Sequence, residues 1–182
     1  MIRYTVGSWG HYILRIREVG MAESLGSQQA LRLEAAVQAF VDRIQAVPGE
    51  LLQRSPKPGE WTLTELAAHS AEIYSYWAKQ VADLKGRSGQ PFGRTASDAD
   101  RIKFVEDHSM DSIAPLVATI RQGASAAAAA LRSYTDGEWR SVTGVHEARG
   151  EMTMDAISNL FLAGHAEEHL KQFDETLAKL RS

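Results

Sequence analysis

The stretch that decides the fold covers residues 153–180 and reads TMDAISNLFLAGHAEEHLKQFDETLAKL. Its apolar side chains recur every three or four positions, which is the period of a helix that buries one face. The spacing therefore predicts one continuous helix over residues 153–180. In steps of four along its buried face lie Ile157, Phe161, His165, His169, Phe173 and Leu177. Two imidazoles thus share a buried stripe with large apolar side chains.

Three earlier segments have the same helical period, and together with the last one they predict an all-α four-helix bundle with one long connection. The predicted helices cover residues 29–47, 62–84 and 112–134. The first is expected to stop at Pro48-Gly49, because proline cannot continue a helix. The core-facing residues are predicted to be Leu33, Val37, Phe40, Val41 and Ile44, then Leu66, His69, Ile73, Tyr76 and Trp77, then Ile113, Leu116, Val117, Ile120, Ala127 and Leu131.

The segments between the helices carry capping and turn signals. The second helix opens at Thr62-Leu-Thr-Glu65, a capping box in which the hydroxyl and the carboxylate each accept from a free amide. Residues 86–100 are rich in Gly, Ser, Asp and Arg and predict a surface connection, followed by a short helical turn over residues 101–107. Residues 144–150 predict a turn before the last helix. The alanine-rich residues 123–130 are expected to pack closely, because small side chains let a neighbouring helix approach.

The first twenty residues do not follow the helical pattern. Tyr12, Leu14 and Ile16 share the two-residue period of a strand. We therefore expect an N-terminal extension over residues 1–25 and a four-helix bundle domain over residues 26–182. The extension is open to three interpretations: an accessory strand, a dimer arm and an artefact of start-site choice.

Composition argues against several classes of protein. The 182-residue chain has no cysteine, so no disulfide can form and a metal must be held by nitrogen or oxygen ligands. Its 20 Lys and Arg against 23 Asp and Glu give a net charge of −3 without long blocks of one sign, which disfavours nucleic acid as a partner. No apolar run reaches the roughly 18 residues of a membrane span, and charged residues near the start argue against a secretory signal. We expect a cytoplasmic protein that acts on a small molecule.

Three histidines form the candidate metal site. His165 and His169 are four residues apart, so both imidazoles face the same side of the last helix. His69 lies on the buried stripe of the second helix. A single buried histidine is more often a hydrogen-bonded core residue, but three unpaired imidazoles would cost about 1 to 3 kcal/mol each. A shared divalent ion is the more economical interpretation, and three nitrogen ligands suit zinc or nickel with one position open.

Other side chains near the same faces are candidates for supporting roles. Glu168 is the candidate catalytic residue, because a carboxylate beside the ion can transfer a proton. Gln172 and Glu72 are candidates for orienting the ligand histidines or for proton transfer. His11, His108 and His146 are expected in polar or irregular surroundings. Asp107, His108 and Asp111 are an alternative cluster or a solvated helix start. Trp61 is expected to be a packing anchor, and Tyr74, Tyr76 and Trp77 are expected in the bundle core or the pocket wall.

The segments GEWTLTELAAH at residues 59–69 and GHAEEHLKQ at residues 164–172 resemble the DinB/YfiT-like superfamily of four-helix metalloproteins. The resemblance covers about residues 28–180, and its specific part is matched by Trp61, His69, His165, His169 and Gln172. It implies an up-down-down-up bundle that holds nickel or zinc on three histidines, often as a homodimer. It also implies kinship with thiol S-transferases that use bacillithiol, mycothiol or glutathione, and with maleylpyruvate isomerase.

Three functions are consistent with these observations, and an enzyme is favoured. The leading hypothesis is a metal-dependent S-transferase in which the ion activates a small thiol cofactor for attack on an electrophile. The second is a hydrolase in which metal-bound hydroxide attacks an ester or amide, with Glu168 moving the proton. The third is a non-catalytic dimeric binding module that the metal stabilises. Solvent access to the ion distinguishes the third hypothesis from the first two.

Overall fold

The computed structural model describes residues 23–182, so the predicted strand over residues 1–20 and His11 lie outside the described part. The helices are α1 (Leu25–Gln45), α2 (Gly49–Leu52), α3 (Leu63–Leu84), α4 (Ala99–His108), α5 (Ile113–Arg132), α6 (Asp136–Ser141), α7 (Met154–Phe161) and α8 (Ala163–Arg181). The strands are β1 (Pro91–Phe92), β2 (Thr143–His146) and β3 (Gly150–Thr153).

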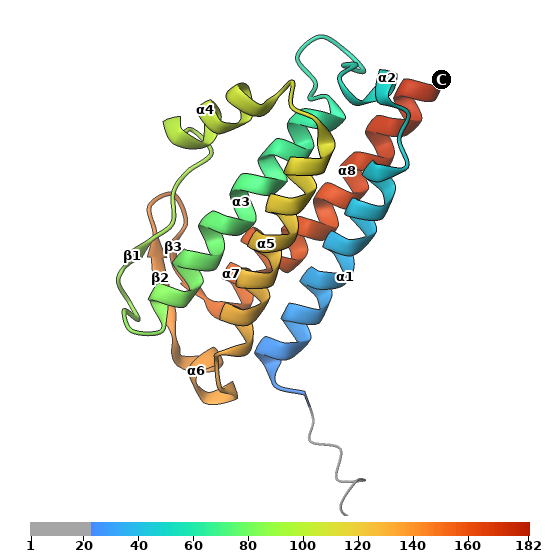
Figure 1. The fold of residues 1–182 in the computed structure, drawn as a ribbon. Coiled ribbons are helices and arrows are strands. Elements are labelled where there is room, and N and C mark those ends of the chain that lie inside the picture. The colour runs from blue at the N-terminus through green and yellow to red at the C-terminus, as the bar shows by residue number, and fades with distance from the viewer. Residues whose placement is uncertain (1–22) are drawn as a thin grey trace, which may run out of the picture.

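The long helices α1, α3, α5 and α8 form a four-helix bundle, as the sequence predicts (Figure 1). In Figure 1, α1 and α8 run upward while α3 and α5 run downward, which is the expected up-down-down-up order. Helix α5 packs against both α3 and α1, and α8 packs against α1 and α3. Since α3 and α5 run in the same direction, the chain between them must return along the length of the bundle. That return segment contains β1 and α4.

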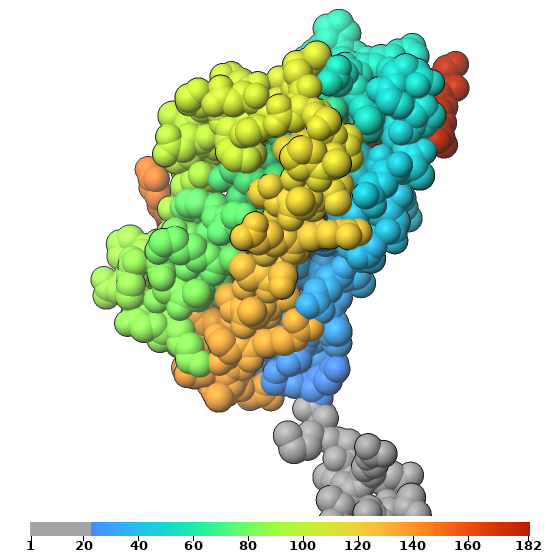
Figure 2. Space-filling model, viewed as in Figure 1, coloured from blue at the N-terminus to red at the C-terminus, as the bar shows by residue number. Residues whose placement is uncertain are grey.

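The core of the bundle is built from the predicted stripes. Phe40 of α1 packs edge to face against Phe173 of α8, with ring centroids 5.4 Å apart. Figure 2 shows α5 between α3 and α1. Ala124, Ala127, Ala128 and Ala130 of α5 are buried, which agrees with the close packing expected for the alanine-rich segment. No helix within residues 23–182 is long and apolar enough to cross a lipid bilayer.

Helix α3 begins where its capping box predicts. The Thr62 hydroxyl accepts from the Glu65 amide at 3.1 Å, and the Glu65 carboxylate accepts from the Thr62 amide at 2.7 Å. Helix α1 starts four residues earlier than residue 29, because Ser24 caps it and accepts from the Ser27 amide. The two caps fix the starting points of helices whose buried faces meet in the core.

The predictions of a plain surface connection over residues 86–100 and of a plain turn over residues 144–150 are incomplete. Strand β1 pairs in parallel with β2, and β2 pairs antiparallel with β3 to form a small sheet beside α3. Two- and four-residue strands with few alternating apolar residues give almost no periodic signal, so sequence patterns miss them. The sheet matters because it carries residues of the functional site.

The prediction of one continuous helix over residues 153–180 is also wrong. The helix breaks at Leu162, whose φ of −129° and ψ of −94° are not helical, and it resumes as α8. The break brings the Asn159 carbonyl against Gly164, where an added Cβ would lie only 2.2 Å from the oxygen. Glycine is required at this close approach. The break is hidden in the sequence because apolar residues keep the helical spacing on both sides of it. As a result, α7 and α8 present their side chains to different parts of the same site.

Candidate metal centre

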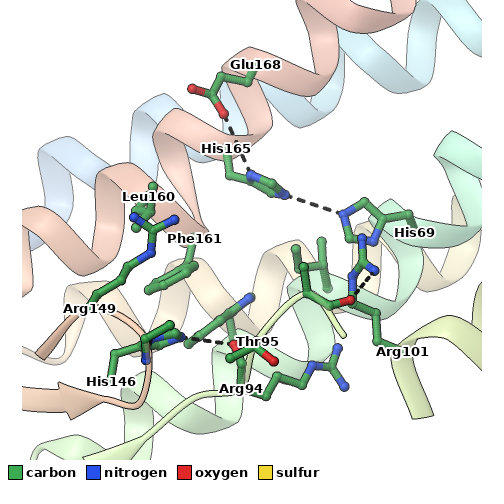
Figure 3. A pocket seen from close by; sticks show the side chains of 14 residues that line it. His69, Arg94, Thr95, Arg101, His146, Arg149, Leu160, Phe161, His165 and Glu168 are labelled. Atoms are coloured by element: carbon green, nitrogen blue, oxygen red, sulfur yellow. Dashed lines mark hydrogen bonds and ion pairs between the residues drawn. The ribbon is translucent and has the colours of Figure 1, made fainter. Parts of the chain in front are cut away.

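His69, His165 and His169 converge on one point between α3 and α8. The Nε2 atoms of His69 and His165 are 3.5 Å apart, and one nitrogen from each of the three rings lies within 4.8 Å of the others. Figure 3 shows the His69 and His165 rings pointing toward each other from opposite helices. Within residues 23–182 this is the one group of three or more histidine or carboxylate side chains close enough to share an ion. The structure therefore brings together the three residues that the sequence singled out.

The three imidazoles are neutral at physiological pH. Burial lowers the pKa of His69 to about 2, and the neighbouring His169 adds to the effect. Burial likewise lowers the pKa of His165 to about 4 and that of His169 to about 3. A neutral imidazole offers a lone pair, which is the form that binds a metal ion. The surroundings thus keep all three rings in the ligand form.

The hydrogen bonds of the rings leave nitrogen atoms free toward the common point. Nδ1 of His169 lies 3.1 Å from Oε1 of Gln172, so a protonated Nδ1 donates to the amide oxygen and leaves the lone pair on Nε2. That Nε2 is buried and has no hydrogen-bond partner in the described chain. A tetrahedral zinc ion with bonds of about 2.0 to 2.1 Å would separate ligand nitrogens by about 3.3 Å, close to the spacing of His69 and His165. The residues present fit a late divalent ion.

Glu168 lies beside the outer nitrogen of His165. Its Oε2 is 3.9 Å from His165 Nδ1, and its side chain is 77% exposed. Glu168 therefore sits at the open edge of the cluster, within the wall of a cavity that His69 and His165 also line. Trp61 packs against the other side of His69 with ring centroids 5.1 Å apart, in keeping with its predicted role as a packing anchor.

Glu72 does not hold a ligand histidine through any hydrogen bond. Its carboxylate forms an ion pair with Arg94, which also binds Asp98 at 3.1 Å and lies 3.8 Å from the ring centre of Tyr76. The prediction placed Glu72 correctly one turn beyond His69, but it did not foresee an arginine from the segment after β1. Glu72 instead anchors that segment against α3.

A cavity of about 470 Å³ extends from the histidines toward the small sheet. Trp77 of α3 and Phe161 of α7 stack in its wall with ring centroids 3.9 Å apart and an angle of 11° between the rings. Trp77 therefore belongs to both the bundle core and the pocket wall, the two interpretations that the sequence allowed. Tyr74 is buried in the core. The cavity gives small molecules access to His69 and His165, whereas Nε2 of His169 is buried.

The expectation that His146 lies in irregular surroundings is wrong. His146 is only 3% exposed, lines the cavity and stacks on Phe161 at 5.3 Å and 22°. The Ala148 amide donates to its Nδ1 at 3.2 Å, so its Nε2 carries the proton and donates to the Arg94 carbonyl at 3.0 Å. Both nitrogens are occupied, which makes His146 a wall residue that ties β2 to the Arg94 segment. Its sequence neighbourhood carried no signal of this role.

Gly93 lets that segment approach the wall. Its φ is +76°, and an added Cβ would lie 2.7 Å from Trp77 and 3.0 Å from His146. A larger residue would strain the backbone and push against both rings.

The alternative cluster around His108 lies on α4. His108 Nδ1 is 2.6 Å from Asp111, while Asp107 forms an ion pair with Lys103. These side chains are partly or largely exposed, as predicted, but they lie at the end of α4 and not at the start of a helix.

Comparison with known families agrees with the geometry. The sequence profile of the DinB superfamily matches residues 32–173. The chain belongs to the DinB superfamily. The match includes all three histidines and Gln172. No curated protein matches the chain in sequence.

Two solved structures resemble this DinB-superfamily chain in fold. One is YfiT from Bacillus subtilis, described as a probable metal-dependent hydrolase with an unusual four-helix bundle topology. The comparison has a TM-score of 0.68 and 13% sequence identity, and it covers 84% of this chain and 87% of YfiT. The other is TT2238, described as a four-helix bundle protein, with a TM-score of 0.58 and 18% identity over 82% of this chain and 98% of TT2238. At these identities the likeness establishes the bundle and its topology.

Proposed function

We propose that this member of the DinB superfamily is a metal-dependent enzyme that acts on a small molecule bound in the cavity beside His69, His165 and His169. The observation that carries the proposal is the convergence of three neutral imidazoles, two of which, His69 and His165, line that cavity. A sealed site would favour a purely structural ion, whereas a site with three protein ligands and a cavity leaves a position for substrate. The geometry thus argues against a non-catalytic binding module.

When bound, a zinc or nickel ion would act as a Lewis acid that polarises a substrate or lowers the pKa of a nucleophile. The three histidines would hold it, and Gln172 would fix the ring of His169 by accepting from its Nδ1 proton. Glu168 would accept the proton of the nucleophile, since its carboxylate is exposed in the cavity wall next to His165.

We propose hydrolysis of an ester or amide as the reaction that the site itself supports best. Water is the nucleophile that needs no further binding site, and Glu168 supplies a carboxylate to take its proton. The description of YfiT as a probable metal-dependent hydrolase supports the same reaction. Transfer to or from a small thiol is the second candidate. It is supported by the family resemblance and by a cavity of about 470 Å³, within the size range of sites that enclose drug-sized ligands.

The experiment that tests the proposal measures metal content first and activity second. Purified protein loaded with zinc or nickel is assayed with 4-nitrophenyl esters without thiol, and with 1-chloro-2,4-dinitrobenzene plus glutathione, bacillithiol or mycothiol. Turnover that requires both metal and thiol would assign the transferase; turnover that requires metal alone would assign the hydrolase.

Glu168→Gln should lower kcat by about 10²- to 10⁴-fold with unchanged metal content. The matched control is Glu167→Gln, because Glu167 pairs with Arg32 away from the cavity. A protein that binds no metal would refute the proposal.

A further inference from the structure

The cavity beside the histidines has an excess of positive charge. Its charged lining residues are Arg94, Arg101, Arg149 and Glu168. Arg94 forms ion pairs with two carboxylates, those of Glu72 and Asp98. Within residues 23–182, neither Arg101 nor Arg149 has a carboxylate oxygen within 4.0 Å. Two guanidinium groups in the wall thus have no contacting carboxylate, and Glu72 and Asp98 attract Arg101 only from a longer distance.

Arg101 is the better placed of the two. It lies in the first turn of α4 and is partly buried, with its Nη1 donating to the Ala96 carbonyl at 3.0 Å. Its guanidinium is 5.7 Å from the ring centre of Trp61, the residue that packs on His69. Arg101 lines the same cavity as His69 and His165, which places it close to the metal centre. A partly buried charge without a partner is costly, and an anionic ligand would supply that partner.

The wall beside the arginines is flat and aromatic. Phe161 stacks on both Trp77 and His146, whose own ring centroids are 6.5 Å apart, and all three rings line the cavity. Stacked rings of this kind favour contact with a planar or apolar body. Arg149 is exposed and projects from the turn between β2 and β3 near Leu160 and Phe161, at the outer edge of the cavity (Figure 3).

We propose that the cavity binds a small organic acid, with its carboxylate or phosphate on Arg101 and its apolar body against Phe161 and Trp77. The proposal deepens the function above, since it names the class of substrate that would present its reactive group to the three histidines. Arg149 would add long-range attraction at the entrance. The guanidinium fork suits both oxyanions, because each can accept two parallel hydrogen bonds.

The test is a binding measurement by calorimetry with benzoate, phenyl phosphate and the neutral isostere benzamide. Both acids are expected to bind the zinc-loaded protein at least about tenfold more tightly than benzamide, and the tighter of the two acids identifies the preferred oxyanion. Arg101→Gln should weaken binding of the acids by about 10- to 100-fold, which corresponds to the loss of a charge-assisted hydrogen-bonded pair. Arg101→Lys should give an intermediate loss, because it keeps the charge but not the fork.

Two controls separate failure of this inference from failure of the metal site. Arg121→Gln, an exposed arginine on α5 outside the cavity lining, should leave the affinities unchanged. Circular dichroism and zinc content of Arg101→Gln should match the parent protein. The same titrations on metal-free protein should still show the Arg101-dependent preference for the acids. If zinc does not bind but this preference persists, the proposed metal function fails and the proposed acid site is supported. Equal affinity for benzoate and benzamide, or unchanged acid affinity in a folded Arg101→Gln variant, would overturn the inference.

Discussion

Replacing His169 by alanine should abolish the stabilisation of the protein by zinc while leaving the metal-free protein folded. His169 supplies a buried nitrogen, Nε2, that has no partner in the described chain, and its other nitrogen is already bound to Gln172. Without it, only His69 and His165 remain as ligands. Two imidazoles do not complete the set of three protein ligands that an open zinc site uses.

The expected magnitudes follow from the burial of the ring. At free zinc about 1,000 times the dissociation constant, binding stabilises the native state by about 4.1 kcal/mol. For a domain of this size that shift raises Tm by about 8 to 16 °C, since each kcal/mol is worth about 2 to 4 °C. In metal-free protein, losing the packing of the buried ring lowers the free energy of unfolding by about 2 to 4 kcal/mol. Removing an unpaired buried nitrogen raises it by about 1 to 3 kcal/mol. The metal-free variant should therefore lose little stability.

The assay is thermal unfolding followed by circular dichroism, with and without zinc, for the parent protein, His169→Ala and His108→Ala. His108 is the matched control, because its imidazole, at the end of α4, pairs with Asp111 and is not part of the three-histidine cluster. The parent and His108→Ala should show the full rise in Tm with zinc, and His169→Ala should show none. A His169→Ala variant that keeps the zinc-induced rise would refute the reasoning.

Three further predictions concern the surroundings of the site. Gln172→Ala should weaken zinc affinity by about 10- to 100-fold in calorimetry, because His169 loses the group that fixes its tautomer; an unchanged affinity would mean that this hydrogen bond is irrelevant. Gly93→Ala should be about 1 to 3 kcal/mol less stable in urea than Gly89→Ala, since both glycines have a φ of +76° but only at Gly93 does the new Cβ meet Trp77 and His146; equal losses would count against that contact. Metal-free protein should lose stability as the pH falls from 6.5 toward 4, by up to about 1.4 kcal/mol per pH unit for each ligand histidine, because unfolded imidazoles take up protons that the buried rings with lowered pKa values do not. Identical urea midpoints at pH 7.5 and pH 5 would contradict this.

The bundle and the identity of the three converging histidines were predictable from sequence because both follow from local periodicity. Imidazoles at steps of four among Ile157, Phe161 and Phe173 must share their face, and the same holds for His69 between Leu66 and Ile73. The capping box at Thr62 marked the start of α3 by local hydrogen bonding alone. Periodicity also identified Gln172, whose contact with His169 lies within one helical turn.

Only the tertiary structure decided what surrounds those imidazoles. The break at Leu162, the strands beside α3 and the turn at Gly93 bring Arg101, His146 and the Phe161 face to one cavity. These residues come from segments far apart in the chain and lack regular spacing, so nothing in a local pattern records their contact. Glu72 shows the same limit, because its partner Arg94 lies on a segment whose path depends on the small sheet. Spacing along a helix fixes which side chains share a face, whereas long-range packing determines what that face meets.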